Sequence, residues 1–295
     1  MKRLFGALAA LLVTTLAFAA SERTALADDE AAATAELTLA ESIPGWDISW
    51  PQCGKAYPPG PVAFAIIGIN NGRPFTTNPC FMHQYLWAQR SEQHPAVYVN
   101  TAFPKPEHTE ANLGPYGLCA ADDGWCRGYN YGWGLANDVV LRVAQMRITP
   151  PIYWLDVETG NYWSSDKQNN SQVIRGALDY FRQRNLKVGI YGTPYQWSLI
   201  AGSYTAPGVP IWTAGAQGID AAARRCTPAY TFAGGTVVMV QYYDWGFDTN
   251  YICPGTETLF PHPKLHPPSV GPQGRGNALT GQALHHWHVM PMLSN

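Results

Sequence analysis

The sequence predicts an α/β fold, a barrel in which strands alternate with helices. Short apolar runs recur between residues 44 and 253 with helical or loop segments between them, which is the spacing of repeated β/α units. The helical segments become sparse after residue 202, so the last strands are expected to be joined by loops. In such a barrel the active site lies at the carboxyl ends of the strands.

The expected elements follow from the apolar periodicity and from the turn residues between the runs. Strands are predicted at 45–49, 62–69, 96–101, 152–157, 187–191, 209–214 and 236–242. Helices are predicted at 80–89, 135–146 and 168–184, with a short one after Pro194. One barrel domain over 44–253 accommodates these elements. Outside it, 28–43 is expected to be a linker, and 254–295, rich in Pro, Gly and His, a disordered tail.

The N-terminus is typical of a secretory signal peptide. Met1-Lys2-Arg3 is followed by an apolar stretch that ends at Ala20, and small residues suited to cleavage precede Asp28. We expect a signal peptide over 1–27, cleaved after Ala19 or Ala27. An uncleaved membrane anchor is disfavoured, because the apolar run is short for a span of about 20 residues. The protein is therefore expected to be extracellular or associated with a cell wall.

Six cysteines, an even number in an exported chain, predict three disulfides. Their order as three successive local pairs favours the pairings Cys53 with Cys80, Cys119 with Cys126, and Cys226 with Cys253. A zinc site is the competing interpretation. It is disfavoured because no Cys-x-x-Cys motif or histidine cluster accompanies these cysteines, and no metal is expected.

The composition narrows the class of partner. The 19 basic and 21 acidic residues leave a net charge of −2, which argues against nucleic acid or, after signal removal, an anionic membrane. Aromatic residues make up 13% of the chain, and their flat rings suit sugars better than phosphates. The sequence has no Gly-x-Ser-x-Gly elbow and no phosphate-binding glycine loop, so neither serine hydrolysis nor a nucleotide cofactor is expected. We expect a monomer that needs no cofactor.

The apolar run from Pro151 ends in two carboxylates, Asp156 and Glu158. Because side chains alternate faces along a strand, both are expected on one side. Buried carboxylates without partners are costly, so such a pair indicates a site rather than a scaffold. The alternative is a structural ion pair with Lys167 or Arg175. Two close carboxylates raise each other's pKa, which suits one of them to be a general acid.

Further candidates lie near the first and last predicted strands. Asp47 ends the first strand, and Asp248 follows the last one; each could equally be an ordinary turn aspartate. Several aromatic residues are candidates either for a sugar groove or for the barrel core, and the sequence leaves both interpretations open. They are Trp46, Trp50, Trp154, Trp212 and Tyr242.

Five short motifs in order resemble those of the glycoside hydrolase family 25 (GH25) lysozymes, which are secreted muramidases. They are Gly45-x-Asp47-x-Ser49-x-x-Gln52, Leu155-Asp156-x-Glu158, Ile190-Tyr191-Gly192, Ile211-Trp212-Thr213-Ala214, and Val240-Gln241-Tyr242 with Asp248-x-Asn250. The resemblance implies a TIM-like (β/α)5(β)3 barrel, with eight strands, five helices and three closing strands that lack helices. It also implies cleavage of the bond between N-acetylmuramic acid and N-acetylglucosamine in peptidoglycan.

Carried onto this chain, the resemblance makes Glu158 the general acid. Asp156 would stabilise an oxocarbenium-like or oxazolinium intermediate, with the acetamido group of the substrate as nucleophile. Asp47 and Asp248 would orient the sugar and hold charge. Substrate contacts are expected from Trp46, Trp50, Tyr191, Trp212, Gln241, Tyr242 and Asn250.

The sequence departs from the family at the ends of the second and third strands. These read Gly68-Ile69-Asn70-Asn71-Gly72 and Tyr98-Val99-Asn100-Thr101, and they are expected to remove polar groups from the mouth of the site. A cysteine-bearing insertion over 104–129 is expected to add a loop there. A wall-binding barrel without turnover, and a hydrolase of another N-acetylhexosamine polymer such as chitin, therefore stay as alternatives.

Overall fold

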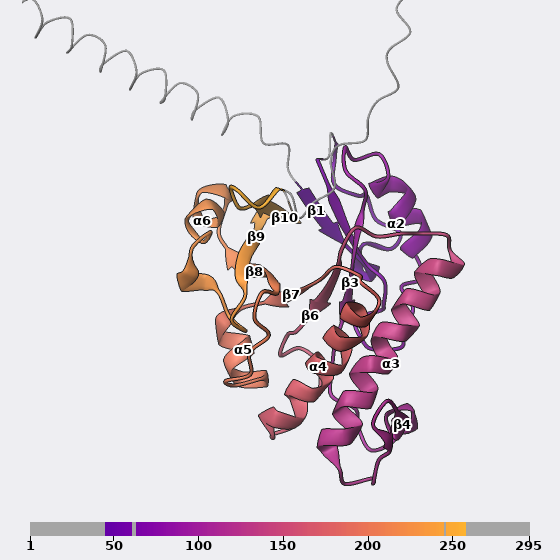
Figure 1. The fold of residues 1–295 in the computed structure, drawn as a ribbon. Helices are drawn as coiled ribbons and strands as arrows, with labels where there is room; N and C mark the ends of the chain where they lie inside the picture. The colour runs from indigo at the N-terminus through magenta and orange to yellow at the C-terminus, as the bar shows by residue number, and fades with distance from the viewer. Residues whose placement is uncertain (1–44, 61–62, 245, 258–295) are drawn as a thin grey trace, which may run out of the picture. The chain divides into compact units, whose positions relative to one another are not determined.

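The structure, a computed structural model, describes residues 45–60, 63–244 and 246–257 of the chain (Figure 1). Eight of its strands close into a barrel. These are β1 (Gly45–Ile48), β2 (Ala65–Gly68), β3 (Ala96–Asn100), β6 (Tyr153–Asp156), β7 (Val188–Gly192), β8 (Pro210–Ala216), β9 (Thr236–Asp244) and β10 (Phe247–Ile252). The predicted α/β barrel is confirmed. The predicted signal peptide, the linker and residues 258–295 of the predicted tail lie outside the described residues.

Helices occupy most connections between the strands. The α-helices are α2 (Phe81–Ala88), α3 (Gly124–Gln145), α4 (Lys167–Gln183), α5 (Pro194–Ile200) and α6 (Ile219–Arg224). Short 3-10 helices are η1 (Trp50–Gln52), η2 (Thr109–Ala111) and η3 (Pro228–Tyr230), and a separate hairpin pairs β4 (Leu113–Gly114) with β5 (Gly117–Leu118). The described residues contain five α-helices and eight barrel strands, the numbers that a (β/α)5(β)3 barrel has. Their order differs from the expectation, because among these residues no α-helix follows β1 and α6 joins β8 to β9, where a loop was expected.

The barrel order is β1-β10-β9-β8-β7-β6-β3-β2. Strand β1 is parallel to β2, and each further neighbouring pair from β2 round to β9 is parallel as well. Strand β10 is antiparallel to both β9 and β1 and closes the ring. Because strand β10 reverses direction, its first residues lie at the carboxyl end of the barrel. The register there places Asp47 beside Asp248 and Asn100 beside Asp156. Residues far apart in the sequence therefore meet at one end.

Two hydrophobic layers stabilise the barrel. The interior is filled by large side chains from alternate strand positions, including Ile66, Trp154, Trp212 and Met239. A second layer packs the outer faces of the strands against the helices. The alternation follows from the period of two along a strand, which sends neighbouring side chains to opposite faces.

Helices α3 and α4 lie side by side (Figure 1), and glycines allow their close approach. A Cβ atom on Gly132 would lie 1.9 Å from the Val173 carbonyl oxygen, and one on Gly176 would lie 2.2 Å from that of Tyr129. Each helix begins at an aspartate cap, since Asp123 accepts from the Cys126 backbone N–H at 2.9 Å and Asp166 from that of Gln168 at 2.8 Å.

Three elements differ from the sequence predictions. Helix α3 begins at Gly124 rather than at residue 135, so part of the predicted insertion loop is helix. Its first turns are rich in glycine, tyrosine and asparagine, which hid the helical period. The short strand β10 and the helix α6 were not predicted. Asp248 therefore lies on a strand and not in a turn.

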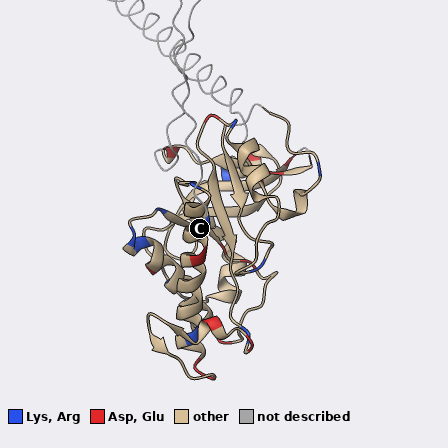
Figure 2. Ribbon diagram, turned by 90° about the vertical axis from the view of Figure 1, so that its right-hand side faces the viewer, with Lys and Arg blue, Asp and Glu red and all other residues tan. Residues whose placement is uncertain are grey.

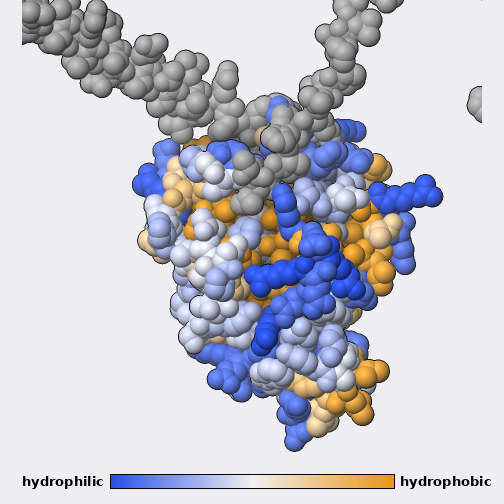
Figure 3. Space-filling model, in the orientation of Figure 1, coloured by the Kyte–Doolittle hydropathy of each residue, from blue (hydrophilic) through white to orange (hydrophobic). Residues whose placement is uncertain are grey.

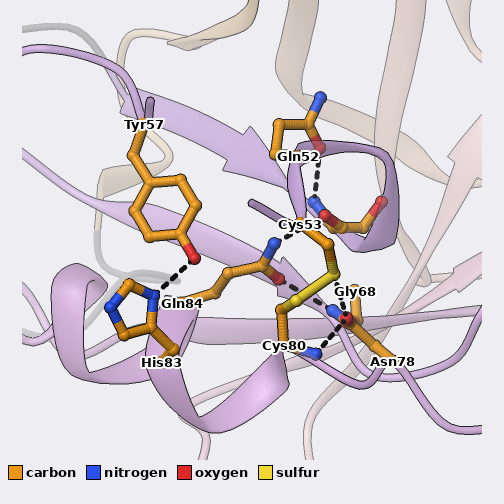
Figure 4. Close-up of a disulfide and its surroundings, with 9 residues drawn as sticks. Gln52, Cys53, Tyr57, Gly68, Asn78, Cys80, His83 and Gln84 are labelled. Carbon is orange, nitrogen blue, oxygen red and sulfur yellow. Dashed lines mark hydrogen bonds between the residues drawn. A yellow bond between two sulfur atoms is a disulfide. The ribbon is translucent and has the colours of Figure 1, made fainter. Parts of the chain in front are cut away.

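The three predicted disulfide pairings are confirmed. Cys53–Cys80 links the segment after β1 to the start of α2 (Figure 4). Beside it, Asn78 donates to the Gly68 carbonyl at 2.8 Å and to the Gln84 side chain at 2.7 Å. The disulfide and this buried amide network hold the first two strand ends in place.

Charged residues are few along the described ribbon, and basic and acidic positions are scattered over it (Figure 2). In the part of the chain that the structure describes, no helix combines the length and hydrophobicity needed to cross a bilayer. Within the same residues, no cluster of His, Cys, Asp and Glu side chains has the arrangement of a metal site.

Candidate active site

A cavity of about 200 Å³ lies at the carboxyl end of the barrel. Strands from all around the barrel contribute to it, as expected for this fold. Its walls are Asp47, Ile48, Ser49, Trp50, Pro51, Gln52, Tyr98, Asn100, Asp156, Glu158, Tyr191, Trp212, Gln241 and Asp248. All four predicted carboxylates line this one cavity, and none of its lining residues is basic.

Asp47 is buried, and amide groups satisfy both of its oxygens. Asn250 Nδ2 donates to Oδ2 at 2.7 Å, and Gln241 Nε2 lies 3.2 and 3.1 Å from Oδ1 and Oδ2. Each amide is held in turn, Gln241 by the Tyr191 hydroxyl at 2.7 Å and Asn250 by the Trp212 indole N–H at 2.8 Å. This network fixes Asp47 rigidly against the closing strands.

Asp156 is held differently, although its side chain is also buried. Asn100 Nδ2 donates to Oδ2, and the Asn100 backbone is fixed by Asn70, whose side chain accepts from its N–H at 3.2 Å and donates to its carbonyl at 3.0 Å. The second oxygen, Asp156 Oδ1, is buried and accepts no hydrogen bond from an N–H or hydroxyl group of the described residues. A polar atom left this way in a cavity wall is suited to a ligand donor.

Glu158 lies just beyond strand β6 and is partly exposed to the cavity. Its Oε1 accepts from Gln196 Nε2 at 3.3 Å, and its carbonyl accepts from the Trp163 indole at 2.8 Å. Among the described residues neither Glu158 nor Asp156 forms an ion pair with a basic side chain. The structural ion-pair alternative is therefore wrong for the described part of the chain.

Burial dominates the electrostatics of the site. Burial raises the pKa of Asp156 well above its usual value, and the charge of Glu158 and a hydrogen bond shared with that carboxyl add to this effect. Asp156 therefore binds a proton more readily than an ordinary aspartate, because protonation removes both the buried charge and its repulsion by Glu158.

The two other aspartates face the same field. Burial and the charge of Asp248 raise the pKa of Asp47 well above its usual value, against the lowering effect of the Asn250 and Gln241 amides. At the rim, removal from water and the charge of Glu158 raise the pKa of Asp248. The cavity is therefore poised to bind a proton or a group with hydrogen-bond donors rather than an anion.

The predicted aromatic contacts divide into two groups. Trp50 and Trp212 line the cavity, whereas Trp46, Trp154 and Tyr242 do not. Trp46 packs edge-on against Phe247, with ring centroids 5.9 Å apart, in the layer between strands and helices. Trp46 neighbours Asp47 and Tyr242 neighbours Gln241, so strand alternation turns both rings away from the cavity. The expectation that Trp46 and Tyr242 line the sugar groove is wrong.

Asn250 also lies behind the cavity wall rather than in it. It donates a hydrogen bond to Asp47 and accepts one from Trp212, so it supports the site without lining it. Trp154 fills the barrel interior, where its ring meets that of Trp212 edge-on at 5.6 Å.

Three residues of the site were not predicted, namely Tyr98, Asn100 and Gln196. The sequence pattern at the third strand end was interpreted as a loss of polar groups, but Asn100 supplies a donor to Asp156. The signal for Asn100 is its register: it pairs with Asp156 on the neighbouring strand, and this is visible only once the strand order is known. Tyr98 is half-buried, and its removal from water raises the pKa of its hydroxyl well above the usual value and keeps it neutral.

The fold and the cavity define the class of protein: a β/α barrel with a cluster of four carboxyl groups, two of them buried, at the carboxyl ends of its strands. The family described as "Lys-1: Lysozyme-like protein 1" matches residues 132–230, which include Asp156 and Glu158. The chain is 41% identical over 70 residues to "Probable GH family 25 lysozyme 5" of Dictyostelium discoideum, a match over 23% of this chain and 32% of that protein. Over this part of its length the chain is similar to a lysozyme-like family and to a GH25 lysozyme.

Two further proteins are similar to parts of the chain. "Probable GH family 25 lysozyme 4" of the same organism is 31% identical over 68 residues, again covering 23% of this chain and 32% of that protein. The matched segment therefore spans about a third of the length of these relatives. The solved structure of a family GH25 lysozyme from Aspergillus fumigatus aligns with a TM-score of 0.43 and 16% identity, covering 74% of this chain and 97% of that chain.

Proposed function

We propose that this protein is a secreted glycoside hydrolase that cleaves the bond between N-acetylmuramic acid and N-acetylglucosamine in bacterial peptidoglycan. The observation that carries the proposal is the Asp156–Glu158 pair, two carboxyls in one cavity of which one is buried with a free oxygen. Glycosidases commonly work with a carboxyl pair and an oxocarbenium-like transition state. The predicted signal peptide and the three disulfides support an extracellular location.

The pair would divide the chemistry as follows. The acetamido N–H of the sugar donates to Asp156 Oδ1, which accepts from no N–H or hydroxyl group of the described residues, and this favours the ionised form of Asp156. Glu158, the more exposed carboxyl, then takes the proton that Asp156 gives up and can reach the glycosidic oxygen. Partial exposure and proximity to the cavity thus make Glu158 the general acid.

Bond cleavage follows from this proton distribution. Glu158 gives its proton to the leaving oxygen as the C1–O bond breaks, and the acetamido carbonyl oxygen bonds to C1. Asp156 stabilises the resulting oxazolinium cation. Water then attacks C1 with Glu158 as base, which restores the acetamido group and the proton on the pair. Asp47 and Asp248 would orient the sugar, with Trp50 and Trp212 against its faces.

A reducing-end assay on purified peptidoglycan tests this function. The wild-type protein should release reducing ends between pH 4 and 8, and Glu158→Gln should lower the rate by roughly 10²–10⁴-fold, the usual contribution of a general acid. Binding of the variant to the insoluble glycan should persist. Release from chitin but not from peptidoglycan would transfer the proposal to another N-acetylhexosamine polymer.

The second candidate function is wall binding without turnover. It is supported by Trp50 and Trp212 in the cavity walls, because flat rings can hold a sugar whether or not the carboxyls cleave it. Binding of peptidoglycan with no reducing ends released across that pH range would establish this alternative and contradict the hydrolase.

A further inference from the structure

A second cavity, of about 340 Å³, lies against the helices rather than at the strand ends. It is formed by the first turn of α3, the first turns of α4 and the segment that follows α5. Its walls are Trp125, Lys167, Gln168, Ser171, Gln172, Ala201, Gly202, Ser203 and Tyr204. It shares no lining residue with the catalytic cavity.

Trp125 gives this cavity a rigid aromatic wall. The side chain is 41% exposed, and its ring stacks on that of Tyr116 at 4.9 Å with an interplanar angle of 17°. Tyr116 lies in the turn of the β4–β5 hairpin, and the next residue after Trp125 forms the Cys119–Cys126 disulfide. One ring face is thus held in a fixed orientation, so that little conformational entropy is lost when a ligand binds to it.

The opposite wall presents amide and hydroxyl groups from α4. Gln172 is only 7% exposed, and its Oε1 has no hydrogen-bond partner among the described residues. Ser171 beside it is fixed by the carbonyls of Lys167 at 2.8 Å and Ala201 at 3.3 Å. Burying an unpaired amide oxygen costs free energy in the empty site, and a ligand hydroxyl donor nearby would recover it.

The remaining walls narrow the class of ligand that this cavity suits. The only cation among the lining residues, Lys167, already donates its ammonium to the Ser198 carbonyl at 2.9 Å. Tyr204 adds a second ring, held by stacking on Trp197 at 6.0 Å. Two rings together with amides, hydroxyls and a single ammonium group suit a polyhydroxylated ligand better than an apolar molecule.

We propose that this cavity is a second carbohydrate site, in which a pyranose ring lies on Trp125 and donates a hydroxyl to the buried amide of Gln172. The identity of the glycan rests on the proposed function. Trp125 lies in the first turn of α3, within the predicted insertion over 104–129. The β4–β5 hairpin of that insertion lies at the lower right of Figure 1, where Figure 3 shows exposed hydrophobic side chains in orange. The insertion thus adds a place to hold the wall polymer away from the bond being cut.

Binding is tested in the Glu158→Gln background, so that the glycan stays intact. Trp125→Ala should weaken binding to insoluble peptidoglycan roughly tenfold, the effect of losing one stacking ring with its buried area. Leu118→Ala is the matched control, because Leu118 is 82% exposed on the hairpin that carries Tyr116 and lies outside the cavity. It should leave binding unchanged, and Trp125→Tyr should restore most of it.

Gln172→Leu tests the other wall with a side chain of similar size. It should weaken binding of an N-acetylglucosamine tetrasaccharide several-fold without lowering the thermal midpoint, because the oxygen it removes has no partner to lose. In the otherwise native enzyme, both cavity variants should raise KM for insoluble peptidoglycan and leave kcat on a soluble oligosaccharide unchanged.

The outcomes separate this site from the hydrolase proposal. Equal wall binding by Trp125→Ala and its parent, or an equal loss in Leu118→Ala, would overturn the second site whether or not the enzyme cleaves glycan. Weaker binding by Trp125→Ala in a protein that releases no reducing ends would support the second site and contradict the hydrolase.

Discussion

The β1 side and the β6 side of the catalytic cavity each carry a buried aspartate, and the two are supported in opposite ways. Asp47 accepts from two amides that are themselves anchored, so both of its oxygens are satisfied. Asp156 accepts from one amide and keeps Oδ1 free of N–H and hydroxyl donors in the described residues. A satisfied carboxyl positions its neighbours, whereas one with a free oxygen can respond to a substrate.

The sharpest test of this difference is Asp156→Asn. We expect kcat on peptidoglycan to fall by roughly 10²–10³-fold, because removal of one preorganised electrostatic partner of the transition state costs this much in other enzymes. KM should change little. Steady-state kinetics on soluble peptidoglycan fragments checks this, and a loss below fivefold would place the free oxygen outside the chemistry.

Asn100 should have the next largest effect, through Asp156. Asn100→Ala removes the donor to a carboxylate, a bond worth about 1.5–3 kcal/mol, so kcat should fall roughly 10- to 100-fold. Loss of this donor also raises the pKa of Asp156 further. The ascending limb of the kcat/KM profile should therefore move to higher pH.

Asn100→Asp keeps the size of the side chain but places a second charge opposite Asp156. It should move the same limb in the same direction and further, because like charges disfavour ionisation. A lower rate with an unchanged pH profile in both variants would assign Asn100 a purely structural role.

On the β1 side, Asp47→Asn should have a milder effect on turnover. The new amide group faces the amide donors of Gln241 and Asn250, so about one hydrogen bond of about 1 kcal/mol is lost and kcat should fall about fivefold. Measured beside Asp156→Asn, it is the matched control. If Asp47→Asn proved the more damaging of the two, the division of roles proposed here would be reversed.

The smallest expected effect is on stability. The pKa of Asp156 and of Asp47 is raised in the folded protein, so the fold binds protons more readily than the unfolded chain. The free energy of unfolding should therefore be greatest below the ordinary aspartate value of about 3.9 and fall as pH rises through the folded values.

Thermal melts between pH 4 and 8 measure this dependence. The midpoint should decline by a few degrees, since about 1 kcal/mol moves it roughly 2–4 °C in a domain of this size. Asp156→Asn should flatten the decline because it removes one of the two groups. A midpoint that rises over this range in the wild type would contradict the raised pKa values of Asp47 and Asp156.

Much of the site was predictable from short patterns. The acid pair stood out because two carboxylates at the end of an apolar strand cannot be ordinary core. The disulfides followed from the order of the cysteines, and seven strands from apolar runs. Strand β10 was missed because Phe247–Ile252 contains Asp248 and Asn250, residue types that are common in turns. Its strand partners become known only from the structure.

The aromatic residues show why other predictions failed. The sequence offers both Trp46 and Trp212 as candidates for a sugar groove, yet Trp46 packs outward and Trp212 lines the cavity. A shift of one position on a strand changes the face, and composition does not record the shift. Asn100 was misjudged for the same reason, because its partner is 56 residues away in the sequence.

By itself, the sequence determined the barrel class, the cysteine pairs and the four carboxylates, because each depends on local periodicity, order or residue type. The tertiary structure decided which oxygen of which carboxyl is free, which aromatic rings line the cavity, and that Trp125 and Gln172 meet around a second one. Those facts depend on strand register and helix packing, which bring distant residues within a few ångströms, and a linear pattern carries no such distances.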